Sequence, residues 1–209
     1  MMRNNFSTRS IGLALILALL TACGGTTVKE EVATETEIQQ AISPGSTQTL
    51  NPDDFSQYHQ AVDTLNSGDN DKATKLLQKI SRRNPSYGPA QGNLALAYYR
   101  SGRLDEAETA ILAAVQLAPE SAGFYNLRGL IAVDRRDFKT AEQAYLKALA
   151  LNPEHALAHY NIALLYDIYF QKIPQAYQHY LTYLNLIDYQ DKDTVDWVEQ
   201  LQYSVEAKQ

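Results

Sequence analysis

The sequence has one cysteine among its 209 residues, and its longest apolar run covers only ten residues, Ile11 to Leu20. A single cysteine cannot form an internal disulfide, so a disulfide-bonded framework is excluded. A helix of ten residues is about 15 Å long, roughly half the hydrocarbon core of a bilayer, so this run does not predict a spanning helix. Basic residues are also fewer than acidic ones, 18 against 24. The net charge of −6 and the pI of about 5.2 argue against nucleic acid as a partner.

Motifs for catalysis are missing as well. The sequence contains neither a G-x-x-x-x-G-K phosphate loop nor a G-x-S-x-G nucleophile elbow. The best metal candidate is the pair His155 and His159, but it lacks the glutamate of H-E-x-x-H, and His155 is expected in a turn. Asp69 and Asp71 are expected to stabilise a helix start. We therefore predict a protein that is not an enzyme, with no catalytic residue, no metal and no cofactor.

The N-terminus has the features of an export signal. Arg3 and Arg9 form a positive region, residues 11–20 form the apolar region, and the small side chain of Ala22 suits a signal peptidase. Residues 1–22 are therefore predicted to be a signal peptide.

The residues around the cysteine match a more specific sequence motif. Leu-Thr-Ala-Cys at residues 20–23 resembles the lipobox of bacterial lipoproteins, which implies lipidation of Cys23 and cleavage before it. The alternative is an unmodified thiol after an ordinary signal peptide. Gly24 stands where lipoproteins of the inner membrane usually carry Asp, so the resemblance implies a lipid anchor in the outer membrane, facing the periplasm.

The segment after Cys23 has the composition of a linker. Residues 24–52 contain no aromatic residue, six threonines and four glutamates. Such a composition cannot bury enough apolar surface to offset the entropy of the chain. We predict a disordered tether that, together with the cysteine, spans residues 23–53.

From residue 54 onward the sequence repeats with a period of 34. Pro85, Pro119 and Pro153 lie 34 residues apart, and small residues keep the same step at Ala61, Ala95 and Gly129. This pattern resembles the tetratricopeptide repeat (TPR), a pair of antiparallel helices called A and B. The resemblance implies an all-α helix-turn-helix solenoid with three intact repeats at 54–87, 88–121 and 122–155, a fourth irregular unit at 156–187, and a capping helix and tail at 188–209.

The fourth unit departs from the pattern. It has one residue more between Tyr166 and Ala176 than repeat 2 has between Tyr98 and Ala107, and Pro174 stands where helix B begins. Proline is tolerated in a first helical turn, so we predict two helices joined by a looser turn. The final helix has apolar residues at helical spacing, namely Trp197, Val198, Leu201 and Val205, and is predicted to pack against the end of the array. It is predicted to begin at a cap formed by Asp193 or Thr194.

In TPR arrays the A helices line a concave groove that binds protein segments. By repeat position, the resemblance places the following residues in the groove: Tyr58, His59, Asn93, Leu96, Tyr99, Arg100, Asn126, Leu130, Asp134, Tyr160, Asn161, Leu164 and Asp167. The sequence is also rich in tyrosine near its end, and we predict a second aromatic patch at Tyr169, Tyr177 and Tyr183.

The predicted function is therefore that of a scaffold. We expect a membrane-anchored adaptor that binds envelope proteins or peptide segments in the groove, for example during assembly of a pilus or a secretion machine. The alternative is a regulator that recruits peptidoglycan hydrolases or proteases to the outer membrane. The sequence leaves the identity of the partner and the oligomeric state open.

Overall fold

The computed structural model describes residues 49–206, with side chains up to Gln202, and every element in that range is helical. The helices lie in the following order along the chain: α3 (Pro52–Asn66), α4 (Asn70–Arg83), α5 (Gly88–Arg100), α6 (Leu104–Leu117), α7 (Ala122–Asp134), α8 (Phe138–Leu151), α9 (Ala156–Leu164), the π-helix η1 (Leu165–Tyr169), α10 (Ile173–Leu186) and α11 (Lys192–Glu206). The predicted all-α fold is confirmed. Within this range no helix is long and apolar enough to cross a membrane.

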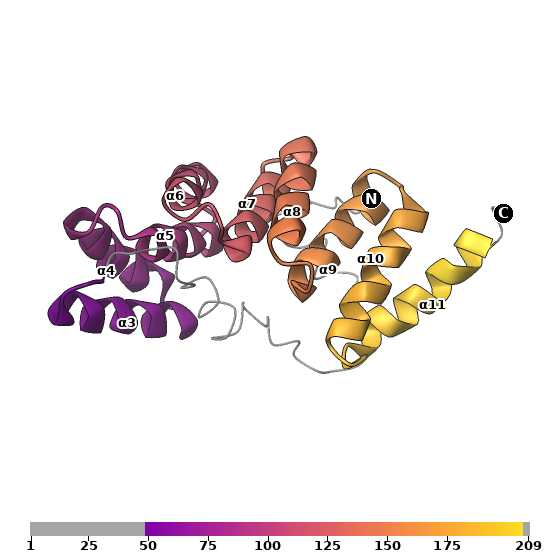
Figure 1. The fold of residues 1–209 in the computed structure, drawn as a ribbon, viewed down its shortest axis with the longest axis horizontal. Coiled ribbons are helices and arrows are strands. Elements are labelled where there is room, and N and C mark those ends of the chain that lie inside the picture. Colours follow the sequence, from indigo (N-terminus) through magenta and orange to yellow (C-terminus); the bar gives the residue numbers. More distant parts are fainter. Residues whose placement is uncertain (1–48, 207–209) are drawn as a thin grey trace, which may run out of the picture. The chain divides into compact units, whose positions relative to one another are not determined.

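The helices pack in pairs along the chain (Figure 1). Each helix contacts the next one in sequence, from α3 against α4 to α10 against α11. Each A helix also touches the A helix of the following pair, since α3 contacts α5, α5 contacts α7, and α7 contacts α9. The second to fourth A helices begin at Gly88, Ala122 and Ala156, where the period of 34 places them.

The turn between helix A and helix B is the same in the first three pairs. Its central residue has a positive φ of 87° at Gly68, 71° at Gly102 and 61° at Arg136. A non-glycine residue is uncommon in this conformation. Just after it, a backbone N–H donates to a carbonyl five residues earlier, as from Arg103 to Tyr98 over 2.9 Å. The period therefore repeats the backbone conformation as well as the residue types.

The fourth pair absorbs its extra residue inside helix A. The π-helix η1 widens the last turn, which is how a single inserted residue is commonly accommodated. The turn that follows still has a positive φ, 51° at Gln171, and the Lys172 N–H donates to the Tyr166 carbonyl over 2.8 Å. This bond spans six residues, against five in the first three pairs, so the turn is one residue wider, as the looser turn predicted from the sequence implies. The extra residue lies in the last helical turn, η1.

Small residues let the helices of a pair approach closely. Ala61, Ala95 and Ala163 are fully buried at the crossing points. At Gly129 an added Cβ would lie 2.3 Å from the ring of Tyr145, which real Cβ atoms do not tolerate. The Tyr145 ring can therefore pack in the core because residue 129 has no side chain.

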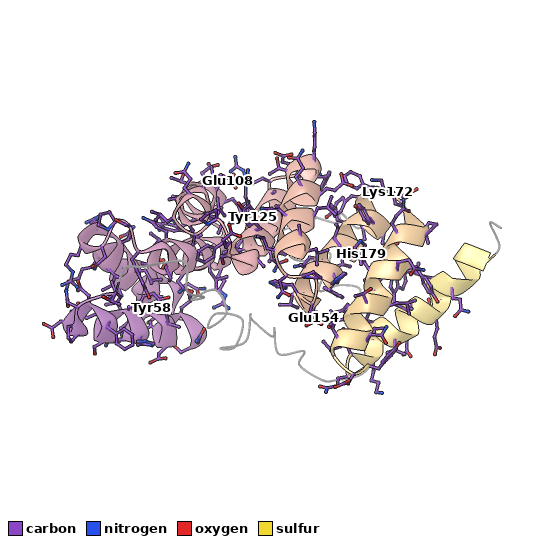
Figure 2. All side chains as sticks on the ribbon, in the orientation of Figure 1. Tyr58, Glu108, Tyr125, Glu154, Lys172 and His179 are labelled. Atoms are coloured by element: carbon purple, nitrogen blue, oxygen red, sulfur yellow. The ribbon has the colours of Figure 1, made fainter. Side chains whose placement is uncertain are left out.

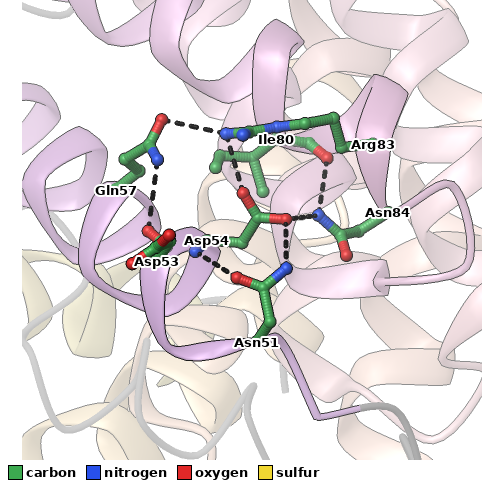
Figure 3. Close-up of polar contacts among 7 residues, drawn as sticks. All are labelled: Asn51, Asp53, Asp54, Gln57, Ile80, Arg83 and Asn84. Atoms are coloured by element: carbon green, nitrogen blue, oxygen red, sulfur yellow. Dashed lines mark hydrogen bonds and ion pairs between the residues drawn. The ribbon is translucent and has the colours of Figure 1, made fainter.

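A polar cluster fixes the start of the array (Figure 3). Asn51 caps α3 by accepting from the N–H of Asp54 at 2.9 Å. The buried Asp54 carboxylate accepts from Asn84 at 2.9 Å and pairs with Arg83 at 2.7 Å. The hydrogen bond from Asn84, helped by the charge of Arg83 and opposed by burial, lowers the pKa of Asp54.

Helical structure begins earlier than predicted. Leu50 packs against the first hydrophobic core and α3 starts at Pro52, inside the segment predicted as a tether. The cap of the final helix is also corrected: Asp191, rather than Asp193 or Thr194, accepts from the Thr194 N–H at 3.1 Å. The signal peptide, Cys23 and most of the predicted tether lie outside the described residues.

Candidate functional site

The thirteen predicted groove residues lie on α3, α5, α7, α9 and η1, and we refer to them as the helix A row. They differ in exposure. Tyr58, Asn93 and Asn126 are buried, with exposed fractions of 1%, 7% and 7%, while the other ten are half-buried. The three buried side chains pack within the array and leave little surface for a partner, and their assignment to the groove stays a prediction.

Neighbouring A helices are joined by hydrogen bonds between residues 35 positions apart. Asn93 Nδ2 donates to the Tyr58 hydroxyl at 2.6 Å, and Asn161 Nδ2 donates to Asn126 Oδ1 at 2.9 Å. The guanidinium of Arg100 donates to the Leu65 carbonyl at 3.0 Å. Each bond links one repeat to the next and fixes the orientation of both side chains.

Tyr99 and Asp134 form another link of this kind, and they bring a carboxylate into the row. Burial raises the pKa of Asp134, and the hydrogen bond from Tyr99 opposes that rise. A half-buried carboxylate flanked by a hydroxyl can accept hydrogen bonds from a bound segment. Arg100, on the preceding A helix α5, supplies the opposite charge.

The row ends against α11. Asp167 Oδ2 accepts from Trp197 Nε1 at 2.9 Å and from the Tyr180 hydroxyl at 3.4 Å. Trp197 remains 44% exposed. Sequence reasoning identified Trp197 only by its helical spacing, because no repeat position links the final helix to the row.

Aromatic rings flank the row at both of its terminal helices. Phe55, 53% exposed on α3, meets the ring of His59 edge-on with centroids 4.3 Å apart. Tyr160 packs against Tyr183 at 4.9 Å, and burial raises the pKa of Tyr160. Leu96 and Leu164 pack at the edges of the two hydrophobic cores, and they keep part of their surface open.

The three tyrosines of the predicted second patch have different neighbours. Tyr169 is 44% exposed and stacks on Phe138 of α8 at 4.1 Å. Tyr183 donates to Asp191 at 3.1 Å, near the start of α11. Tyr177 is half-buried against the second core. The contacts described for them do not bring the three together.

The histidines have structural roles in the fourth pair. His155 is buried and caps α9 through its Nδ1, which accepts from the Ala158 N–H at 3.3 Å. His159 places Nε2 3.0 Å from the Pro153 carbonyl and Nδ1 2.9 Å from Nδ1 of His179, which lies on the side of α10 that faces α9 (Figure 2). Among residues 49–206 no group of three or more His, Cys, Asp or Glu could hold a metal ion.

Taken together, the helix pairs and the row define a repeat array: a stack of helices whose A faces present mixed polar and apolar side chains. Residues 64–131 and 126–167 each match a tetratricopeptide repeat model. Residues 64–167 therefore carry tetratricopeptide repeats, and repeats of this kind typically serve as non-enzymatic scaffolds for protein–protein interaction.

Solved structures agree on the fold. PilF of Pseudomonas aeruginosa is 20% identical with a TM-score of 0.66, covering 74% of this chain and 69% of PilF. The TPR protein TTC0263 of Thermus thermophilus is 21% identical with a TM-score of 0.63, covering 73% of this chain and 82% of its own. The first TPR domain of Spaghetti (RPAP3), solved with the HSP90 peptide SRMEEVD, is 21% identical with a TM-score of 0.53, covering 55% of this chain and 90% of that domain. No curated protein matches the sequence.

Proposed function

We propose that this chain is a non-enzymatic adaptor that binds an extended segment of a partner protein along the helix A row. The observation that carries the proposal is the series of hydrogen bonds between residues 35 positions apart, exemplified by Asn93 with Tyr58 and Asn161 with Asn126. These bonds hold the row in one conformation before a partner arrives. A preorganised surface binds more tightly because less side-chain freedom is lost on association.

The chemistry of the row favours a segment of mixed character. Half-buried leucines at residues 96, 130 and 164 alternate with polar groups along successive A helices. Arg100 offers a cation, while Asp134 and Asp167 offer carboxylates. Aromatic and Arg side chains are the ones that most often dominate binding energy at interfaces, and Phe55, Arg100 and Trp197 meet that description. The likeness to an array solved with a bound peptide supports this mode of binding.

We further propose that the adaptor works in a bacterial envelope. The lipobox-like residues 20–23 and the preceding signal-like segment support lipidation of Cys23, anchoring in the outer membrane and exposure to the periplasm. Assembly of a pilus or secretion machine is the role we favour. Recruitment of peptidoglycan hydrolases or proteases would instead be recognised by the identity of the bound proteins.

The groove proposal is tested with two matched substitutions in one repeat. Leu130→Arg places a long cation in the helix A row, whereas Leu146→Arg places the same side chain on α8 at a leucine that is 46% exposed. Both variants and the wild type are crosslinked in cells and purified, and bound proteins are identified by mass spectrometry. We expect the recovery of at least one bound protein to fall at least about fivefold in L130R and to be unchanged in L146R. Equal recovery from all three, with equal circular dichroism, would move the binding site away from the row.

The anchor is tested separately. Cells are fed an alkyne fatty acid, and the wild type is compared with Cys23→Ala. Label on the wild type alone, together with its recovery in the outer-membrane fraction, would support the proposed anchor. Wild-type protein that carries no label would contradict it, while leaving the proposal about the helix A row untouched.

A further inference from the structure

Helix α4 has an outer surface unlike that of any other B helix in the described chain. Its exposed residues are basic with the exception of Asp71, and we call the basic ones the α4 face: Lys72, Lys75, Lys79, Arg82 and Arg83. They account for five of the 18 lysines and arginines of the whole chain. At 100° per residue these five positions fall within an arc of about 100°, and they extend over roughly 16 Å of helix.

The repeat itself provides the comparison. The other three B helices carry largely uncharged residues at the corresponding positions. These residues are Glu106, Thr109, Ala113, Gln116 and Leu117 on α6; Thr140, Gln143, Lys147, Ala150 and Leu151 on α8; and Gln175, Gln178, Thr182, Asn185 and Leu186 on α10. Only Lys147 is basic. The repeat pattern therefore does not require cations at these positions, and their concentration is particular to α4.

Only one of these five cations forms an ion pair within residues 49–206, although Lys79 also acts on the Asp54 carboxylate and lowers its pKa. Arg83 pairs with Asp54 at 2.7 Å and donates to Gln57 at 2.9 Å (Figure 3). Asp71 interacts electrostatically with Arg103. The ion pairs found within residues 49–206 do not involve the other four cations of the α4 face. The net charge of −6 for the whole chain thus conceals one strongly positive helix face.

We propose that the α4 face docks on an anionic phospholipid surface. Its exposed residues include no aromatic or aliphatic side chain that could act as the buried anchor of a protein interface. Long, mobile cations in a row suit a surface of many mobile phosphates, which needs no complementary shape. Each Lys or Arg near such a surface strengthens binding about fivefold, equivalent to about 1 kcal/mol.

The position of the face in the chain is compatible with this partner. α4 belongs to the first helix pair, and Asn51 lies 28 positions after Cys23 in the sequence. That length can span at most about 100 Å and allows the first pair to lie near a bilayer that holds the N-terminus. Docking through α4 is independent of lipid on Cys23 and of peptide binding by the helix A row.

The test uses the full wild-type chain reconstituted into vesicles of phosphatidylcholine alone or mixed with phosphatidylglycerol. A short pulse of an amine-acetylating reagent is followed by mass spectrometry of each lysine. We expect Lys72, Lys75 and Lys79 to react at least about fivefold more slowly in the anionic vesicles. Lys139, Lys147 and Lys192 are internal controls that should react equally in both. At 1 M salt, where the Debye length is about 3 Å, the difference should vanish.

Three results would overturn the proposal. Equal reactivity in both vesicles would show that the lipid charge is not sensed. Protection that depends on protein concentration rather than on lipid would assign the face to a second copy of the chain. Protection that persists in detergent without vesicles would assign it to acidic residues of the same chain, such as those at 30–37.

A pair of variants sharpens the result. Lys75→Glu with Lys79→Glu should remove the lipid-dependent protection of Lys72. The matched change, Lys139→Glu with Lys147→Glu on α8, alters the charge equally and should leave that protection intact. If both variants retain it, the α4 face is not the docking surface.

Discussion

The third and fourth helix pairs reach the same arrangement by different means. In the third pair, an exact period of 34 residues sets the turn at Arg136, and Gly129 admits Tyr145 into the core. In the fourth pair, an extra residue is stored in the π-helix η1, and the turn at Gln171 has the same sign of φ. The comparison shows that the positive φ of the turn and the packing of the pair are preserved, while the spacing at the end of helix A and the span of the bond that closes the turn are not.

The strongest test of this comparison is deletion of one residue from each pair. Deleting Ile168, which is 50% exposed within η1, should return the fourth pair to the regular spacing and change the free energy of unfolding by less than about 1 kcal/mol. Deleting Val133 from α7 should displace the Asp137-to-Ala132 backbone bond and cost about 3–5 kcal/mol. Urea denaturation followed by circular dichroism measures both, and equal losses would contradict the proposed role of η1.

Substitution at Gly129 tests whether the close contact with Tyr145 determines the packing of the third pair. Gly129→Ala should destabilise the protein by about 2–3 kcal/mol, because its Cβ would overlap the Tyr145 ring. In the second pair the corresponding residues are Ala95 and Ile111, both buried, so alanine is tolerated opposite a smaller side chain. Adding Tyr145→Ile to Gly129→Ala should therefore recover part of the loss. A double variant no more stable than Gly129→Ala alone would show that the tyrosine is not the obstacle.

The His159–His179 pair makes the fourth helix pair sensitive to acid. The rings lie 2.9 Å apart at Nδ1, and burial, with the nearby charge of His159, lowers the pKa of His179 to about 4. An unfolded histidine titrates near 6.5. Between about pH 6.5 and 4 the unfolded chain therefore binds a proton that the folded chain does not, so stability falls as the pH falls.

We expect this effect to be worth up to about 2 kcal/mol, since His179 is only half-buried and solvent screens part of it. Thermal unfolding of the wild type and of His179→Gln, measured from pH 7 to pH 4, should converge as the pH decreases. His59→Gln, a histidine on α3, is the control and should follow the wild type. Parallel curves for all three proteins would contradict the assignment to this pair.

The smallest effect on stability is expected for the hydrogen bond between Asn126 and Asn161, which joins the third and fourth helix pairs. A double-mutant cycle with Asn126→Ala and Asn161→Ala should give a coupling energy of about 0.5–1.5 kcal/mol, typical of one hydrogen bond. A coupling energy near zero would mean that this bond does not help to order the helix A row.

Much of the fold could be predicted from local patterns. The prolines at 85, 119 and 153 and the small residues at helix crossings placed the helix pairs, because a fixed period reflects one repeated backbone conformation. The insertion before Ala176 was also visible, but its location was not. How an extra residue is divided between a wider turn and a wider helix depends on which arrangement preserves packing against neighbouring helices, and the sequence does not display those contacts.

The candidate site could be predicted only in part. The row of A-helix positions follows from the repeat, but the roles of its members do not. Tyr58 and Asn93 were predicted as groove residues, and the sequence did not reveal that they form a hydrogen bond with each other. Trp197 was expected to pack a capping helix, and it also completes the row through Asp167. Such pairings depend on how successive helices are rotated, which single positions do not encode.

The sequence by itself determined the all-α class, the helix pairs and the unusual charge of α4, because these depend on periodicity and composition along one helix. Only the tertiary structure decided which side chains of the helix A row are engaged with their neighbours and where the inserted residue is stored. The physical reason is that hydrogen bonds across 35 residues and close contacts such as that of Gly129 with Tyr145 form only when separate helices are brought to within a few ångströms of each other.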